Sequence, residues 1–183
     1  MKRLLMLFAV LLLFGCSEND VADQDELISF IKEYNEEVDF LNGEDNDVPE
    51  VDKITDDEIG LPEREERYWQ KLLEIKTELL EESFSVTAKY DKDKVLSGYQ
   101  VSSHGDTSNI TKEEVFFSEQ GIIAPIMVAK VLGLNSNTYD EHFNLALHSN
   151  EPSIEYIDSG YKVSYLVLSD LGMLVVNFDK IGD

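Results

Sequence analysis

Cysteine is almost absent from this chain of 183 residues, because Cys16 is the only one. No disulfide can therefore form within the chain. Bases are also scarce, with 15 Lys and Arg against 38 Asp and Glu, and the formal charge is −23. Such a chain offers no basic surface to the phosphates of nucleic acid and is repelled by an anionic membrane surface, which excludes nucleic-acid binding and flat membrane adsorption.

The sequence also lacks the short motifs of several enzyme classes. It contains no glycine-rich phosphate loop, no Gly-x-Ser-x-Gly and no His-Glu-x-x-His. Of the three histidines, His142 and His148 are six residues apart, which does not match the i, i+4 spacing of a zinc pair on a helix. We therefore expect no metal site and no cofactor, and a non-catalytic protein.

One loop keeps an enzymatic alternative open. A hydroxyl, an imidazole and a carboxylate gather in Ser102, Ser103, His104 and Asp106. A serine hydrolase needs the imidazole between the other two groups and a serine on a strained turn, whereas this stretch is rich in ordinary turn formers. The alternative function is an envelope hydrolase that uses the His104/Asp106 loop.

No apolar run is long enough to span a bilayer. The longest begins at Leu4 and supplies twelve residues up to Gly15, whereas a spanning helix needs about 20. Lys2 and Arg3 precede the run, and polar residues follow Cys16. This order is typical of a secretory signal peptide, and here it ends in Leu13-Phe14-Gly15-Cys16.

This segment resembles the lipobox of bacterial lipoproteins, in which a branched apolar residue lies three positions before the cysteine and a small residue directly before it. Phe14 departs from the pattern, which prefers Ala, Ser or Thr there. The resemblance implies cleavage between Gly15 and Cys16 and a diacylglyceryl group on the Cys16 sulfur, whose two chains give stable anchoring. It predicts a protein held on the extracytoplasmic face of the cell membrane, or on the outer membrane if the host has one.

The negative charge is concentrated near the predicted anchor. Cleavage leaves 38 acids against 13 of the 15 bases, a formal charge of −25. Residues 16–61 contain 17 of these acids against Lys32 and Lys53. The acids keep an extracytoplasmic protein soluble, and a partner recognised through charge would be a basic envelope protein or peptide.

The chain after the anchor begins with a tether and one helix. Residues 16–24 have few apolar side chains and are expected to be flexible. A helix is predicted over residues 25–41, because Leu27, Ile31, Tyr34, Val38 and Leu41 form one apolar stripe. Asn42-Gly43 ends it. Whether this helix docks on the remaining chain is left open.

Residues 42–61 form an acidic linker without sustained periodicity. Acids crowd between Glu44 and Glu58, and calcium is bound by such oxygens. The spacing does not match the EF-hand pattern, because no glycine follows an alternating acidic run. A solvated loop is one interpretation, and a cation-responsive module acting through residues 44–58 is the other.

The next segment is predicted to be the strongest helix, over residues 62–82. Pro62 suits the first helical position, Glu63, Glu65 and Glu66 favour the positive end of the dipole, and apolar residues follow at three-and-four spacing. Trp69 is the only tryptophan of the chain. It is expected in the core, although a binding platform is an alternative role.

The period then changes to two. Alternating residues 84–90 and 95–101 around the turn Asp91–Lys94 predict a hairpin. Thr111-x-x-Glu114 is typical of a capping box, and residues 122–134 predict a buried helix that starts near Ala124 and stops at Gly133. A further helix capped by Asn137 is favoured over a strand, and residues 154–178 predict a three-stranded meander whose last two strands are central.

Together these elements predict an α+β fold with an antiparallel sheet of about five strands and helices on one face. The expected organisation is a signal peptide (1–15), an acylated cysteine and tether (16–24), an amphipathic helix with an acidic linker (25–61) and a globular domain (62–183). The expected function is that of a membrane-anchored, non-catalytic binding or interaction module, with the hydrolase and the cation-responsive module as alternatives.

Overall fold

The computed structural model of the chain describes residues 24–43, 51–55, 59, 63–64, 68–76, 83–105, 119–149, 151 and 153–182. The helices in these residues are α1 (Gln24–Gly43), α2 (Glu119–Val131), α3 (Ser136–His148) and the 3₁₀ helix η1 (Ser169–Leu171). The strands are β1 (Glu63–Arg64), β2 (Tyr68–Lys76), β3 (Ser83–Tyr90), β4 (Leu96–His104), β5 (Ser153–Asp158), β6 (Tyr161–Leu168) and β7 (Met173–Lys180).

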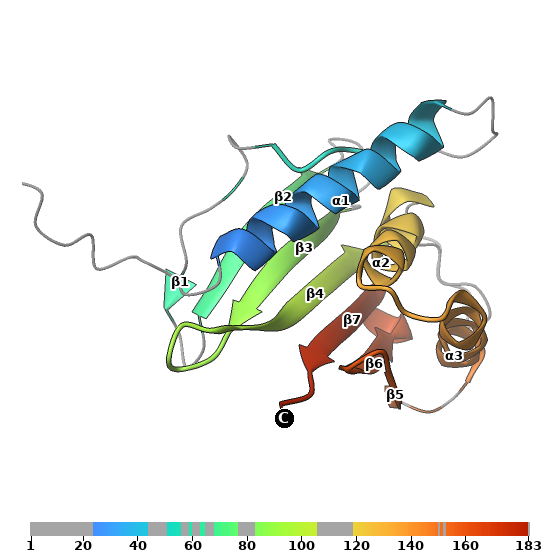
Figure 1. The fold of residues 1–183 in the computed structure, drawn as a ribbon. Helices are drawn as coiled ribbons and strands as arrows, with labels where there is room; N and C mark the ends of the chain where they lie inside the picture. Colours follow the sequence, from blue (N-terminus) through green and yellow to red (C-terminus); the bar gives the residue numbers. More distant parts are fainter. Residues whose placement is uncertain are drawn as a thin grey trace, which may run out of the picture.

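All seven strands belong to one antiparallel sheet in the order β1-β2-β3-β4-β7-β6-β5. Figure 1 shows α1, α2 and α3 side by side across one face of this sheet. The α+β class and the placement of the helices on one face are therefore confirmed. The strand number slightly exceeds the expected five, and β1 has only two residues.

The core lies between the sheet and the helices. Register pairing carries one buried row across six strands, formed by Leu73, Val86, Val101, Val176, Tyr165 and Ile154. Helices α1 and α3 each contact this face through an aromatic side chain. Phe30 of α1 stacks on Tyr99 at 3.9 Å between ring centroids, and Tyr139 of α3 lies 5.8 Å from the Tyr165 ring. One continuous hydrophobic core results.

The predicted apolar stripe of the first helix is confirmed, and the helix docks. Leu27, Phe30, Tyr34 and Val38 are buried in the same core as the sheet. Burial of this stripe is what stabilises α1, because its surface is strongly acidic and carries no basic residue in the last turn. Burial also raises the pKa of the Tyr34 hydroxyl well above its ordinary value, so this tyrosine stays neutral.

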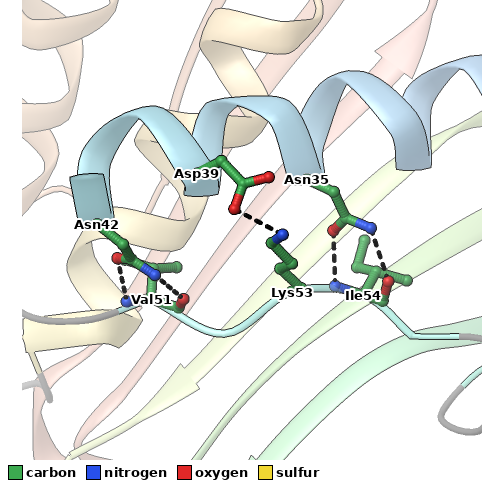
Figure 2. Close-up of polar contacts among 6 residues, drawn as sticks. All are labelled: Asn35, Asp39, Asn42, Val51, Lys53 and Ile54. Atoms are coloured by element: carbon green, nitrogen blue, oxygen red, sulfur yellow. Dashed lines mark hydrogen bonds and ion pairs between the residues drawn. The ribbon is translucent and has the colours of Figure 1, made fainter.

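Part of the predicted acidic linker lies along α1. Figure 2 shows residues 51–55 running beside the helix. The Asn42 amide bonds both the N–H and the C=O of Val51, at 3.1 and 3.0 Å, and the Asn35 amide does the same for Ile54, at 2.9 and 2.8 Å. Lys53 pairs with Asp39 at 2.6 Å. Because Val51 and Ile54 are buried, this segment is a structural part of the helical layer.

The helix predicted over residues 62–82 is wrong, because the described residues there form β1 and β2. A β-bulge between Lys71 and Leu73 explains the misleading pattern. The bulge adds one residue to the strand and interrupts its alternation, so that the consecutive Leu72 and Leu73 are both fully buried. With Trp69, these two leucines imitate the three-and-four spacing of a helix.

The hairpin and the meander are confirmed. β3 pairs with β4 around the turn at residues 91–94, and β5, β6 and β7 follow one another as predicted. The last two strands, β6 and β7, lie inside the sheet rather than at its edge. Ser159 and Gly160 make the tight turn between β5 and β6 with φ angles of 50° and 82°.

Helix α2 begins at Glu119, earlier than the predicted start near Ala124, and Pro125 lies inside it. In a regular helix the carbonyl of Gly121 accepts a hydrogen bond from residue 125, but proline has no N–H to donate. The Ser103 hydroxyl of β4 donates to this carbonyl instead, at 2.7 Å. The buried serine therefore replaces the lost helix bond and fixes α2 on the sheet.

Helix α3 is confirmed, but its cap differs from the predicted one. Asn135, not Asn137, caps the helix, because its side chain accepts from the Thr138 N–H at 3.1 Å. The predicted capping box at Thr111 and Glu114 lies outside the described residues. Of the helices in the described ranges, none is both long and apolar enough to cross a membrane.

Gly98 is required where β4 meets β7. Its φ angle is +148°, which side chains rarely adopt, and a Cβ atom there would lie 2.0 Å from the Phe178 carbonyl oxygen. Both the backbone conformation and the close approach of β7 therefore require glycine in the middle of this strand.

Gly98→Ala is expected to lower the free energy of unfolding by about 3 kcal/mol, because the methyl group must push β7 away from β4. Urea denaturation measures the loss. Gly43→Ala is the control, since Gly43 has nothing within 4 Å of an added Cβ and its φ is not positive. Equal effects of the two substitutions would contradict the close approach.

Ser103→Ala is expected to cost about 1–3 kcal/mol, because it removes the hydroxyl that bonds the buried Gly121 carbonyl. The cost should shrink in a Pro125→Ala background, where residue 125 regains its N–H and can bond Gly121 itself. A double-mutant cycle by urea denaturation measures this coupling. Ser102→Ala, on the other face of β4, is the control, and purely additive effects would contradict the replacement.

Candidate functional site

The second face of the sheet contacts none of the three helices among the described residues, and we call it the helix-free face. Strand register places two polar rows on it. The first contains Trp69, Lys89, Gly98, Asp179 and Lys162, and the second contains Thr87, Gln100, Asn177, Ser164 and Glu155. Along the central strands, the residues of these two rows alternate with the buried residues that face the helices.

Hydrogen bonds join the two rows into a network. Asn177 is its centre, because its carbonyl oxygen accepts from Lys89 Nζ at 3.3 Å and from Gln100 Nε2 at 2.8 Å. The Asn177 amide donates to Ser164 at 3.4 Å, and Ser102 donates to the Gln100 carbonyl oxygen at 3.4 Å. We call these residues, with Asp179, the polar network. Side chains from four neighbouring strands are thereby held in one arrangement.

Lys89 is the buried member of this network. Its side chain is only 4% exposed, and its ammonium forms an ion pair with Asp179, which is 40% exposed. The ammonium also lies 5.6 Å from the centroid of the Trp69 ring. A buried lysine requires such partners, because an unpaired ammonium is costly in an apolar environment.

Gly98 makes the Lys89–Asp179 pair possible. These two residues lie on β3 and β7, on either side of Gly98 in the same row. Because glycine has no side chain, the lysine can extend over β4 to reach the carboxylate. The glycine that permits close strand packing thus also opens a path for the ion pair.

A second, solvent-exposed ion pair lies beside the polar network, towards the sheet edge, in the same rows as Asp179 and Ser164. Lys162 of β6 lies 2.9 Å from Glu155 of β5. The hydrogen bond to Glu155 raises the pKa of the Lys162 ammonium, with a smaller contribution from Asp179. At neutral pH this end of the helix-free face therefore carries both charges.

The structure does not assemble a catalytic group from the candidate serines and His104. His104 is the last residue of β4, opposite Met173 of β7, rather than in a loop. Ser103 faces the core and donates to Gly121, whereas Ser102 faces away from it and donates to Gln100. Among the described residues, no hydrogen bond joins His104 to either serine, and Asp106 lies outside them.

Most of the acids considered for a cation site also lie outside the described residues, at positions 44–50 and 56–58. The described part between them is occupied by the contacts to α1, including the pair between Lys53 and Asp39. The His142 ring stacks on Tyr156 at 4.2 Å, and its Nδ1 lies 2.8 Å from the Thr138 carbonyl oxygen. Within the described ranges, no group of three or more His, Cys, Asp or Glu is placed to hold a metal.

Two further residues were singled out by the sequence pattern, Cys16 and Trp69. Cys16 lies outside the described residues. Trp69 is not on a buried helix face as expected, because it lies half-buried on β2 beside Lys89. Sequence reasoning missed Lys89, Gln100, Asn177 and Asp179. The available signal was the glycine within an alternating strand, since such a glycine often marks a close approach or a path for another side chain.

Comparison of the chain with protein-family models, with curated proteins and with solved structures found no match.

Removing Asp179 should lower the free energy of unfolding more than removing Lys89 does. Asp179→Ala is expected to lower the free energy of unfolding by about 2 kcal/mol, because it leaves the buried ammonium without its carboxylate. Lys89→Met should cost about 1 kcal/mol or less, since the half-exposed Asp179 can be solvated. Urea denaturation followed by Trp69 emission measures both.

Glu155→Gln is the control for this comparison. It removes a carboxylate from an exposed pair with lysine, so the denaturation midpoint should not change. If Lys89→Met proved more destabilising than Asp179→Ala, the buried member of the pair would have been misassigned.

Proposed function

We propose that this protein is a bacterial lipoprotein, anchored through Cys16 on the extracytoplasmic side of a membrane, that acts as a non-catalytic binding module. The observation that carries the proposal is the order of the first 16 residues, in which a basic pair, a short apolar run and Leu13-Phe14-Gly15-Cys16 follow one another. Because only seven residues lie between Cys16 and Gln24, the first residue of α1, a lipid on Cys16 would keep the folded part near the membrane.

The binding role is supported by the helix-free face. Amide, hydroxyl and charged side chains on this face are fixed relative to one another by the polar network, so a ligand would meet an ordered surface. Trp69 lies beside it and adds an aromatic surface. In contrast, the described serines and His104 are not arranged for acyl transfer.

The strong negative charge supports the same role. A body with a formal charge of −25 after cleavage repels an anionic membrane, so lipid on Cys16 would hold it there while the folded part remains available to a partner. A basic protein or peptide of the envelope is the partner class that this charge favours.

Cys16→Ser is expected to move the protein from the membrane fraction to the soluble fraction of lysed cells, because it removes the acylated sulfur. Ser17→Ala is the matched control and should remain with the membrane. Intact-mass spectrometry of the native protein should give a chain that begins at Cys16 and carries a diacylglyceryl group. An unmodified thiol, or residues 1–15 still attached, would reject the anchor.

A further inference from the structure

We propose that the outer edge of β5 binds an extended basic peptide as an additional antiparallel strand. Among the described strands, β5 is the last of the sheet and pairs with β6 alone. Figure 1 shows it at the end of the sheet opposite β1. The proposal rests on the proposed role as a binding module and names the surface and the class of partner.

The turn that precedes β6 fixes which backbone groups of β5 face outwards. Ser159 and Gly160 form a two-residue turn with positive φ angles, and Asp158 lies opposite Tyr161. In such a hairpin the pair that flanks the turn exchanges both hydrogen bonds, and bonding alternates along the strand. Asp158, Tyr156 and Ile154 therefore bond to β6, whereas the N–H and C=O groups of Ile157, Glu155 and Ser153 point away from the sheet.

These outward groups have no partner within the described ranges. Among the described residues, no hydrogen bond reaches the backbone of Ser153, Glu155 or Ile157 from outside the β5–β6 ladder. The side chain of Ile157 is also 71% exposed and lies on the opposite face of β5 from Tyr156, which contacts α3. An unpaired edge with an exposed apolar residue is a template for strand addition.

The negative charge near the β5 edge favours a basic partner over a second copy of the chain. Glu151, Glu155 and Asp158 give the region of this edge three acids, and Lys162, which pairs with Glu155 at 2.9 Å, offsets one of them. A second copy of the chain has the same large negative charge, −25 after cleavage, and the same acids on its β5, which opposes pairing of two β5 strands. A strand with a lysine opposite Glu155 and an apolar residue opposite Ile157 would pair with the backbone and cover the exposed side chain, and its lysine would be a second cation beside Glu155, after Lys162.

The test uses the full chain in detergent micelles and the blocked peptide Lys-Val-Thr-Lys-Val-Thr-Lys. The peptide should slow amide hydrogen exchange at Ser153, Glu155 and Ile157, as measured by NMR, and binding should weaken with added salt. The same peptide with glutamates in place of lysines should not bind. N-methylation of alternate peptide amides on the side facing β5 should abolish binding, because it removes the donors of the new ladder.

Matched variants separate the edge from general charge attraction. Glu155→Lys should weaken binding of the lysine peptide about fivefold, since it turns an opposite-charge cross-strand pair into a like-charge pair. Glu36→Lys is the control, because Glu36 also pairs with an exposed lysine, Lys32, but on α1. It should have a much smaller effect.

Several results would overturn the proposal. These are binding without protection of the β5 amides, equal binding of the N-methylated peptide, and equal effects of the two charge reversals. If the β5 amides were protected from exchange at high protein concentration without peptide, the edge would bind a second copy of the chain instead. The assay does not depend on acylation, so loss of the anchor at Cys16 would leave its outcome unchanged.

Discussion

The pairing of β4 with β7 is the contact on which the rest of the structure depends. It joins the β2–β4 part of the sheet to the C-terminal meander, across a large separation in sequence. Tyr99 and Phe178 lie opposite each other in this pairing. Phe30 of α1 stacks on Tyr99, and Tyr139 of α3 stacks on Phe178 at 6.4 Å. Two helices that do not follow one another in the chain are thus positioned by one cross-strand pair.

The same pairing also creates the polar network on the other face. Side chains alternate along a strand, so the residues next to Tyr99 and Phe178, namely Gly98 and Asp179, lie on the helix-free face. A shift of one residue in this register would bury Asp179 under the helices and expose Phe178. The core therefore fixes the geometry of the candidate site, and the network needs no loop to hold its side chains in place.

The elements that can be predicted from the sequence are those whose periodicity is uninterrupted. The stripe of α1 and the alternation of Phe84, Val86, Ala88 and Tyr90 in β3 depend on burial of one face, which shows directly in residue spacing. β2 lacks that signal because its bulge makes Leu72 and Leu73 both buried, and the start of α2 is hidden because Pro125 is typical of a helix boundary. The polar network cannot be foreseen, since the meeting of Lys89 with Asp179 depends on the pairing of distant strands.

The described lysines show how an acidic chain uses its few bases. Lys180 pairs with Glu26, Lys130 with Glu37 and Lys53 with Asp39, so each joins α1 to another part of the chain. With 15 bases for 38 acids, most acids cannot have a basic partner in any fold, and the surface stays negative. Charge therefore attracts cationic partners to the whole molecule without selecting a place. In the proposed complex the place would be selected by the outward backbone groups of Ser153, Glu155 and Ile157 on β5, which lack partners among the described residues.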